Sequence, residues 1–412
     1  MLVDNTGAND ANRAAEIAAR SGYGRLLAIL ASQTRDISGA EDALSEAFAS
    51  ALKSWPSKGI PDNPDAWLLT AARRRIIDAA RRSAVHAEAT PQLTLMMKGL
   101  SVEISSERIP DYRLELMFMC AHPAIDEAIR TPLMLQCVLG IKAEKISRAF
   151  LTKPETMSQR LVRAKTKIKD AGIPFKVPDK HEWQSRLEAV LDAIYVAYTV
   201  GWDDEKQAGG LVEEAIWLSR LVERSAPQDP EAKGLLALIL FSESRRPSRR
   251  SSNGEFIQLS LQDTSLWNKQ MINEARKLML AASKNPSLQR YQLEAAIQSV
   301  HARRLETGEI DWKAIVDLYG LLLNVSPSLG AQVAHAAAYG EAFGAKEGLE
   351  KLESLPKTKL ISYTSYWAVK GHLLQKIDRQ NEARESLLKA ANLATDEATR
   401  EWLNKKAAIR RA

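Results

Sequence analysis

Residues 142–169, with the sequence KAEKISRAFLTKPETMSQRLVRAKTKIK, constrain the fold of this chain more than any other segment. Their first part has apolar residues at helical spacing, namely Ile146, Ala149 and Phe150. The residues from Leu151 to Pro154 interrupt this pattern, because the residue before a proline avoids helical dihedral angles. Thr152 and Glu155 have the spacing of a capping box, with Pro154 in the first turn of the helix that follows. The segment therefore predicts two helices joined by a tight connection.

The second of these helices has two contrasting faces. One face is apolar and is expected to be buried: Met157, Leu161, Ala164 and Ile168. The other is cationic, and residues 142–169 together hold nine Lys or Arg against two acidic residues, a net charge of +7. An apolar first helix, a short turn and a cationic second helix are the parts of a helix-turn-helix that reads the major groove of DNA. Charge alone favours a solvated basic helix in an ordinary bundle, and the turn, the cap and the buried positions bring the two interpretations to about equal weight.

The composition describes an ordinary globular protein. Its 412 residues are 45% apolar and 26% charged, enough for two or three domains with their own cores. The net charge of +6 is small for this length but unevenly placed, which indicates an anionic partner for one part of the chain. No apolar run approaches the ~20 residues of a membrane span, and the N-terminus lacks the layout of a signal peptide. Two cysteines, Cys120 and Cys137, suggest no disulfide framework, so we expect a cytoplasmic protein with no membrane partner.

The N-terminal segment, from about residue 11 to residue 82, has helical patterns throughout. Glu41–Trp55 follows a break at Ser38 and Gly39 and is amphipathic. Its expected inner face consists of Ala43, Leu44, Ala47, Phe48, Ala51 and Leu52, and its outer face of Asp42, Ser45 and Glu46. A loop rich in Pro and Gly follows at Pro56–Pro64, and Asp62 or Asn63 is expected to cap the next helix.

That next helix, Asp65–Arg82, is strongly basic. Its core-facing positions are Ala66, Leu69, Ala72, Ile76 and Ala80, with Ile77 beside them. Its arginines are presented to solvent or to a polyanion: Arg73, Arg74, Arg75, Arg81 and Arg82. Trp67 near the helix start could stack on an unpaired base, although a Trp at such a position is more often a packing anchor.

The middle of the chain changes character twice. Residues 83–110 have no sustained period and predict a semi-extended linker. Helical patterns return at Pro110–Ala121 and Ile125–Leu139, before the helix-turn-helix. Two prolines, Pro174 and Pro178, then close this domain, because two prolines so close together end a helix.

These segments, taken in order, resemble a known family. The chain is similar to the extracytoplasmic-function sigma factors of bacterial RNA polymerase in four successive segments: EDALSEAF, DNPDAWLLTAARRRIID, a linker and ETMSQRLVRAKTKI. Three further segments resemble those of the subgroup with a long C-terminal helical extension: IPDYRLELMFMCAHPAI, AEKISRAFL and KDAGIPFKVP. GLLALILFSESRRPSR and YQLEAAIQSVHA continue that resemblance, which therefore covers nearly the whole chain.

The resemblance implies an all-α fold and a domain order. Residues 1–85 would be sigma region 2, 86–110 a linker, 111–178 a helix-turn-helix sigma region 4, and 179–412 a helical-repeat-like extension. The implied partners are core RNA polymerase and promoter DNA.

The resemblance also places functional residues. Core polymerase would be contacted by Asp42, Glu46 and Phe48, with Ser45 departing from the Gln frequent in the family. The −10 element would be melted and bound by Trp67, Arg73, Arg74, Arg75, Arg81 and Arg82. In the −35 element, bases would be contacted by Thr156, Ser158, Gln159 and Arg160, and phosphates by Arg163, Lys165 and Lys167.

From Trp183 onward the sequence predicts one helix after another. The expected helices are Trp183–Thr199, Leu211–Arg224, Pro230–Glu243, Leu266–Ser283, Tyr291–Glu306, Asp311–Val325, Ala331–Phe343, Ala345–Ser354, Tyr363–Gln375 and Asn381–Leu393. The last two resemble a tetratricopeptide-type hairpin, but no clean repeat near 34 residues is visible. Ser242–Asp263 is an irregular basic island, either a β-hairpin at Phe256–Leu261 or a solvated loop. In the resembled subgroup the extension acts as a regulatory or interaction module, which could hold a protein or peptide partner.

Other function classes find little support. The sequence contains no HExxH, P-loop, GxSxG or paired CxxC motif, so we expect neither an enzyme nor a cofactor or metal site. Cys120 and His122 could ligate a metal, but a helix end before Pro123 explains them better. The alternatives are a stand-alone helix-turn-helix regulator with a helical ligand- or protein-binding domain, and a helical scaffold that binds only proteins. A regulator needs neither the acidic helix nor the arginine-rich one, and a scaffold does not need the basic second helix.

Overall fold

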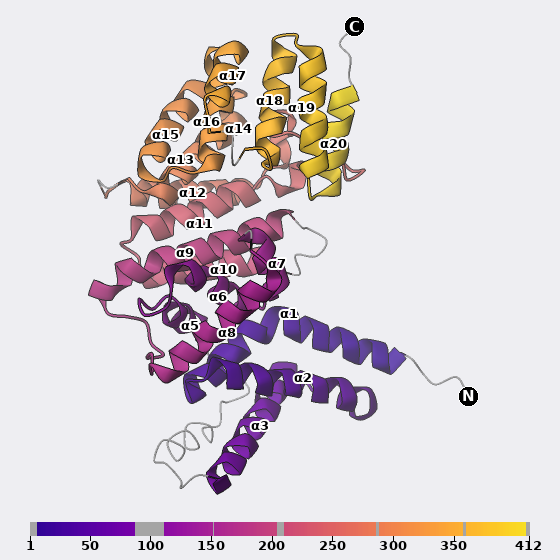
Figure 1. The fold of residues 1–412 in the computed structure, drawn as a ribbon, viewed down its shortest axis with the longest axis vertical. Helices are drawn as coiled ribbons and strands as arrows, with labels where there is room; N and C mark the ends of the chain where they lie inside the picture. The colour runs from indigo at the N-terminus through magenta and orange to yellow at the C-terminus, as the bar shows by residue number, and fades with distance from the viewer. Residues whose placement is uncertain are drawn as a thin grey trace. The chain divides into compact units, whose positions relative to one another are not determined.

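The structure is a computed structural model, and it describes residues 6–86, 111–150, 152–203, 210–285, 288–356 and 360–408. Within these ranges the regular structure is helical, with one isolated β-bridge between Arg250 and Phe256 (Figure 1). The all-α prediction is therefore confirmed. The chain divides into two compact units, Met1–Leu218 and Ser219–Ala412. The expected linker at 86–110 lies almost entirely outside the described residues.

The first unit begins with three helices that pack on one another: α1 (Thr6–Thr34), α2 (Ile37–Lys58) and α3 (Pro64–His86). The helix α2 begins four residues before the expected start, because Asp36 caps it by accepting a hydrogen bond from the Gly39 amide. It also continues through Pro56 into the expected loop. Asn63 caps α3 through the Ala66 amide, which confirms one of the two expected caps.

The same unit continues with α5 (Arg113–Cys120), α6 (Glu127–Cys137), α7 (Ala143–Ala149) and α8 (Pro154–Asp170). The helices α7 and α8 are the two predicted from residues 142–169. The predicted capping box is wrong: α8 begins at Pro154, so Lys153 is the N-cap residue, and it makes no side-chain capping bond. Ile146 is buried as expected and Phe150 is half-buried, whereas Ala149 is exposed and Ser147 is buried instead.

Two further helices complete this unit, α9 (Lys180–Asp203) and α10 (Leu211–Ser225), which crosses its boundary. The helix α9 packs against α5 and α6. Its apolar face is fully covered at Val190, Ala193, Ile194 and Ala197. Because α5 and α6 lie in the expected region 4, the first helix of the extension shares a core with that region.

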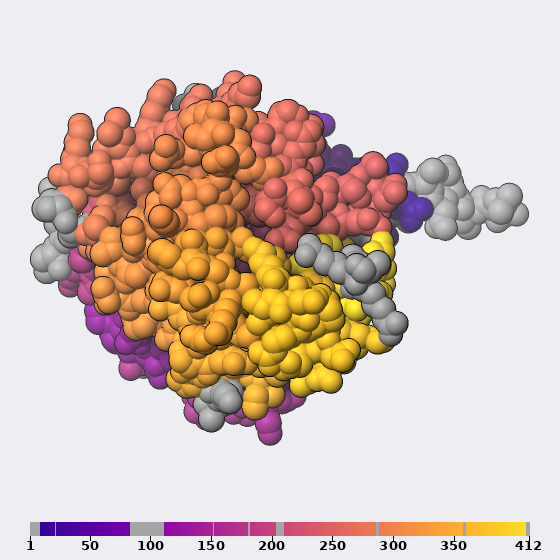
Figure 2. Space-filling view, turned by 90° about the horizontal axis from the view of Figure 1, so that it is seen from above, coloured from indigo at the N-terminus to yellow at the C-terminus, as the bar shows by residue number. Residues whose placement is uncertain are grey.

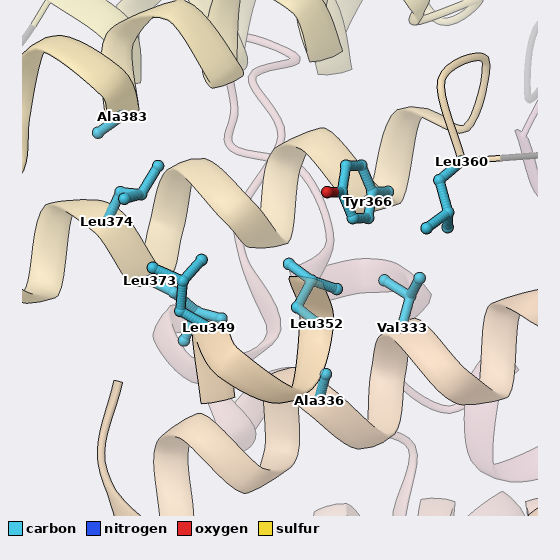
Figure 3. Close-up of a cluster of buried hydrophobic side chains, with 9 residues drawn as sticks. All are labelled: Val333, Ala336, Leu349, Leu352, Leu360, Tyr366, Leu373, Leu374 and Ala383. Atoms are coloured by element: carbon cyan, nitrogen blue, oxygen red, sulfur yellow. The ribbon is translucent and has the colours of Figure 1, made fainter. Parts of the chain in front are cut away.

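The second unit is a succession of helices that pack on their neighbours along the chain. Its helices are α11 (Pro230–Glu243), α12 (Lys269–Ala282), α13 (Arg290–Ala302), α14 (Arg304–Thr307), α15 (Trp312–Val325), α16 (Leu329–Phe343), α17 (Ala345–Glu353), α18 (Thr364–Lys376), α19 (Gln380–Leu393) and α20 (Glu397–Ala408). Successive helices pack together, and the middle (orange) and last (yellow) ones lie side by side in Figure 2. Figure 3 shows one buried cluster of this unit, in which Leu352 of α17 and Leu373 of α18 are fully covered.

The helices expected from Trp183 onward are present, and their bounds differ from the expected ones by up to four residues. Residues 264–266 form a short 3-10 helix before α12, and the expected helix 291–306 divides into α13 and α14. The helix α20 was not anticipated. The tetratricopeptide likeness of the last hairpin stays a prediction.

The basic island at 242–263 is neither of the two expected forms. It contains two short 3-10 helices, η1 (Arg246–Ser248) and η2 (Leu259–Leu261), besides the isolated bridge. Its arginines are engaged: Arg245 donates to Gln298, Arg246 binds Glu243, and Arg250 binds Asp396. Phe256 packs edge-on against Trp402 of α20, with ring centroids 5.4 Å apart. The basic island therefore holds α20 against the rest of the second unit.

Among the described residues, no helix is both long enough and apolar enough to cross a membrane.

Candidate nucleic-acid interface

The exposed face of α2 combines two carboxylates with apolar surface. Asp42 and Glu46 lie one turn apart, and both are exposed. Phe48 and Leu52 are less covered than expected, since Phe48 is half-buried and Leu52 is 45% exposed. We call these four residues the acidic face of α2. At 100° per residue the two carboxylates lie on one side of α2, and Phe48 and Leu52 lie on another. The helix therefore offers an apolar area with charged groups to one side of it, which fits a docking site with an apolar centre and a polar rim.

The helix α3 presents arginines beside that face. Arg74, Arg75, Arg81 and Arg82 are exposed, and Arg73 is half-buried. The Arg73 Nε donates to Gln33 of α1 at 3.2 Å, and burial lowers the pKa of its guanidinium. Arg75 lies 3.4 Å from Glu46, but both side chains are more than half exposed, so this pair contributes little to stability. The exposed arginines remain available to a polyanion.

Trp67 serves as a packing anchor in this structure. Its ring lies edge-on to the buried ring of Trp55, with centroids 5.5 Å apart. Trp67 is half-buried, so part of its surface is still accessible. The contact holds the start of α3 against the end of α2.

The helix α8 separates an apolar from a polar face as its pattern predicts. Met157, Leu161 and Ile168 are at most 2% exposed. The solvent-facing side chains include six of the expected DNA contacts: Thr156, Ser158, Gln159, Arg160, Arg163 and Lys167. Polar and cationic side chains on one solvent-facing surface of a helix match the demands of a groove reader.

Lys165, the seventh expected contact, is turned inward. Its side chain is 7% exposed, and its Nζ binds Glu41 of α2 at 2.5 Å. In this conformation Glu41 occupies the ammonium group that was expected to bind a phosphate. The next turn repeats the pattern, because Lys169 Nζ lies 2.6 Å from the Asp36 carboxylate. A phosphate contact by Lys165 therefore requires that it separate from Glu41.

Sequence reasoning missed Glu41 and Asp36 as partners of α8, although it contained a clue to Lys165. Positions 161, 164, 165 and 168 follow the spacing of an inward helical stripe. Lys165 belongs to that stripe and was assigned outward by its charge alone. A lysine on a buried stripe needs a carboxylate nearby, and Glu41 supplies it.

No metal chemistry emerges from the described residues, which contain no group of three His, Cys, Asp or Glu side chains that could hold an ion. The Nδ1 of His122 accepts a hydrogen bond from the Ala124 amide at 3.1 Å. This bond fits the structural explanation of the turn after α5. Cys120 and Cys137 are both free and buried.

Two family models and one relative match this chain. Residues 19–85, which span most of α1 to α3, match the family model of sigma-70 region 2. Residues 186–283 match a family of unknown function, DUF6596. An uncharacterised protein of Rhizobium meliloti (strain 1021) is 35% identical over 371 residues, covering 88% of each chain. No solved structure matches the chain.

Proposed function

Because this chain belongs to the sigma-70 family and carries a C-terminal extension, we propose that it is a sigma factor of the extracytoplasmic-function type that binds core RNA polymerase and directs it to specific promoters. The observation that carries this proposal is the acidic face of α2 beside the exposed arginines of α3, both within the region-2 match. A sigma factor makes and breaks no covalent bond. It supplies binding energy that selects the DNA at which polymerase starts.

Core polymerase would bind to the acidic face of α2. Asp42 and Glu46 would meet cations of the polymerase, and Phe48 with Leu52 would fill an apolar depression. Such a contact draws most of its energy from the apolar centre, while the charged rim gives orientation and a faster encounter.

The −10 element would lie along α3. Extruding a base from the duplex costs a few kcal/mol, which stacking and phosphate contacts must offset. Arg74, Arg75, Arg81 and Arg82 supply exposed guanidinium groups on one helix, and Arg73 is held closer to the core. Trp67 would offer its accessible part for stacking without leaving Trp55.

The −35 element would be read by α8. Thr156, Ser158, Gln159 and Arg160 lie in its first two turns and would face base edges. Arg163 and Lys167 would bind phosphates, and Lys165 would join them once released from Glu41. The extension would modulate this activity, and its second unit would offer helical surfaces to a protein or peptide partner.

Binding to core polymerase tests the docking assignment directly. Purified chain and core polymerase should form a complex at low salt, and the double variant Asp42→Lys/Glu46→Lys should weaken it at least about tenfold through like-charge repulsion. Glu144→Lys/Glu16→Lys is the matched control, since both are exposed acids on other helices. Equal binding by all three proteins would contradict the docking assignment.

A further inference from the structure

Three helices of the second unit bring a carboxylate, an imidazole and an amine into one row. Glu341 lies on α16, His372 on α18 and Lys406 on α20. The Nε2 of His372 lies 2.8 Å from the Glu341 carboxylate, and its Nδ1 lies 3.4 Å from the Nζ of Lys406. The proposed contacts with polymerase and promoter use none of these three side chains.

Two glycines allow the helices to approach closely enough for this row to form. Gly340 precedes Glu341, and a Cβ atom on it would be 2.5 Å from the Leu373 side chain of α18. Gly371 precedes His372, and a Cβ atom on it would be 2.6 Å from a leucine side chain of α19. The positions of the carboxylate and the imidazole are therefore fixed by the packing of the helix backbones.

The hydrogen bonds of the row assign a tautomer to the neutral His372 ring. A carboxylate only accepts hydrogen bonds, so the Nε2 of His372 carries the proton that it donates to Glu341. The Nδ1 is then the acceptor, and the amine of Lys406 is its donor. Lys376 binds the other carboxylate oxygen of Glu341 at 2.6 Å, so the carboxylate is held from two sides.

The surroundings of Lys406 favour the neutral form of its amine. The side chain is half-buried, and burial lowers the pKa of its ammonium group. The charge of Glu341 opposes this effect, and the charge of Lys376 acts in the same direction as burial. A lysine amine that is partly desolvated and hydrogen-bonded to a base has the features of an activated nucleophile.

We propose that Lys406 is an acylation site, whose amine reacts with small acyl donors of the acyl phosphate class faster than exposed lysines do. This inference goes beyond the proposed function and does not depend on it. A half-buried amine admits only a small donor, and the exposed cation of Lys376 nearby suits a donor with an anionic leaving group.

The reaction balances with the groups of the row. The Lys406 ammonium first releases one proton to water. The bond between its nitrogen and the acyl carbon then forms as the bond between that carbon and the phosphate oxygen breaks. The second proton lost by the nitrogen passes to the Nδ1 of His372, where Glu341 balances the imidazolium charge. The departing phosphate takes up this proton, which returns His372 to its neutral form.

Acylation would change the joint between α18 and α20. The ammonium of Lys406 lies 4.8 Å from the centre of the Trp402 ring, and an uncharged amide cannot make this cation–π contact. Leu403 and Ala407 stay buried on the same helix, so α20 keeps its apolar contacts. The product therefore alters the charge of the extension at this joint and leaves the apolar packing of α20 in place.

Mass spectrometry of the full-length chain treated with acetyl phosphate tests this proposal. Two exposed lysines are internal references: Lys405, whose pair with Glu255 raises the pKa of its ammonium, and Lys389, whose amine lies 4.6 Å from the centre of the Trp367 ring. Near neutral pH we expect Lys406 to be acetylated at least about tenfold faster than either reference, because each unit of lowered pKa gives about ten times more neutral amine. This ratio should narrow as the pH approaches about 10.4, where exposed lysines also lose their protons. A rate for Lys406 no greater than those of the references would overturn the proposal.

Replacing His372 separates activation by the base from the effect of burial. His372→Ala should slow acetylation of Lys406 at least about tenfold and leave that of Lys405 unchanged, because a general base contributes about 10²–10⁴ to the rate. His372→Gln should behave alike, since an amide can accept the hydrogen bond but cannot take the proton. The matched control is His335→Ala, which removes a half-buried histidine of α16 whose ring contacts two tyrosines.

Circular dichroism melts show which of these variants fold. If His372→Ala does not fold, His372→Gln and the rates in the wild-type chain decide the matter. A rate for Lys406 in folded His372→Gln equal to that in the wild type and the control would overturn the assignment of His372 as the base.

Discussion

The ring of Trp183, at the start of the extension, lies against the fully buried ring of Phe118 in α5, with centroids 4.4 Å apart and an interplanar angle of 41°. A second contact between the extension and α5 lies further along the chain. The guanidinium of Arg113 stacks on Trp217 at 4.1 Å and pairs with both Asp111 and Glu214. Helices α9 and α10 therefore complete the core around α5, which precedes the predicted helix-turn-helix.

This relationship predicts where the extension can be removed. A chain cut after Glu182 loses Trp183 and the buried face of α9, so we expect it to unfold at a lower temperature and to bind −35 DNA weakly. A chain cut after Ser225 keeps α9 and α10 and should retain cooperative unfolding and binding. Circular dichroism melts of both truncations check this, and equal melting temperatures would refute the shared core.

Phe118→Ala tests the same core by substitution. The side chain is fully buried, so we expect the free energy of unfolding to fall by about 3–5 kcal/mol. Urea titration of the chain cut after Ser225 measures it. A loss below about 1 kcal/mol would mean that the contact with Trp183 is not part of a packed core.

Substitutions of Arg160 and of Arg163 should have different effects, because Arg160 is proposed to contact bases and Arg163 to contact a phosphate. Arg160→Ala should cost ~1–3 kcal/mol at the preferred −35 sequence and relax the preference at one position. Arg163→Ala should weaken all sequences alike and lower the slope of log K against log salt by about one. Competition binding with single-base variants, at several salt concentrations, distinguishes them. Identical behaviour of the two variants would contradict the assignment of roles.

Gly234 should tolerate no side chain. A Cβ atom there would be 2.6 Å from the amide nitrogen of Gln292, so Gly234→Ala must push α11 away from α13. We expect a loss of about 1–3 kcal/mol from overpacking. The unobstructed Gly320→Ala should instead gain up to about 1 kcal/mol, because alanine favours helix. Denaturant titration of both variants provides the comparison.

The stability of the second unit should fall in acid. Glu341 accepts a hydrogen bond from His372 at 2.8 Å and binds Lys376, and these partners lower its pKa to about 2. The folded state thus binds fewer protons than the unfolded state between about pH 4.5 and 2, so stability is lost as pH falls through this window. Glu341→Gln should flatten that part of the profile. If Glu341→Gln loses stability over the same pH window and to the same extent as the wild type, the assignment of this acid dependence to Glu341 is wrong.

Local patterns predicted much of this fold, and non-local contacts explain the rest. Residues 142–169 specify two helices because spacing and Pro154 act within a few residues. The start of α2 was missed although its cap is local, because Ser38 and Gly39 were interpreted as a break, whereas Asp36 accepts a hydrogen bond from the Gly39 amide and the helix includes both residues. The helix α20 was missed because few of its own residues are buried, Leu403 and Ala407 among them, and a distant segment fastens it through Phe256.

In the candidate site, too, local patterns predicted some features, and others depend on distant residues. Exposure of Asp42, Glu46 and most cations followed from helical periodicity. The inward turn of Lys165 depends on Glu41, 124 positions earlier in the chain, and no single-helix pattern contains that partner. Periodicity could flag Lys165 as inward but could not name the acid that receives it.

Run-off transcription with bacterial core polymerase, this protein and its own upstream DNA tests the proposed role most directly. We predict a discrete transcript that requires the protein and disappears with Asp42→Lys/Glu46→Lys. Core polymerase that yields the same products with and without the protein, over a range of low salt concentrations, would contradict the assignment as a sigma factor.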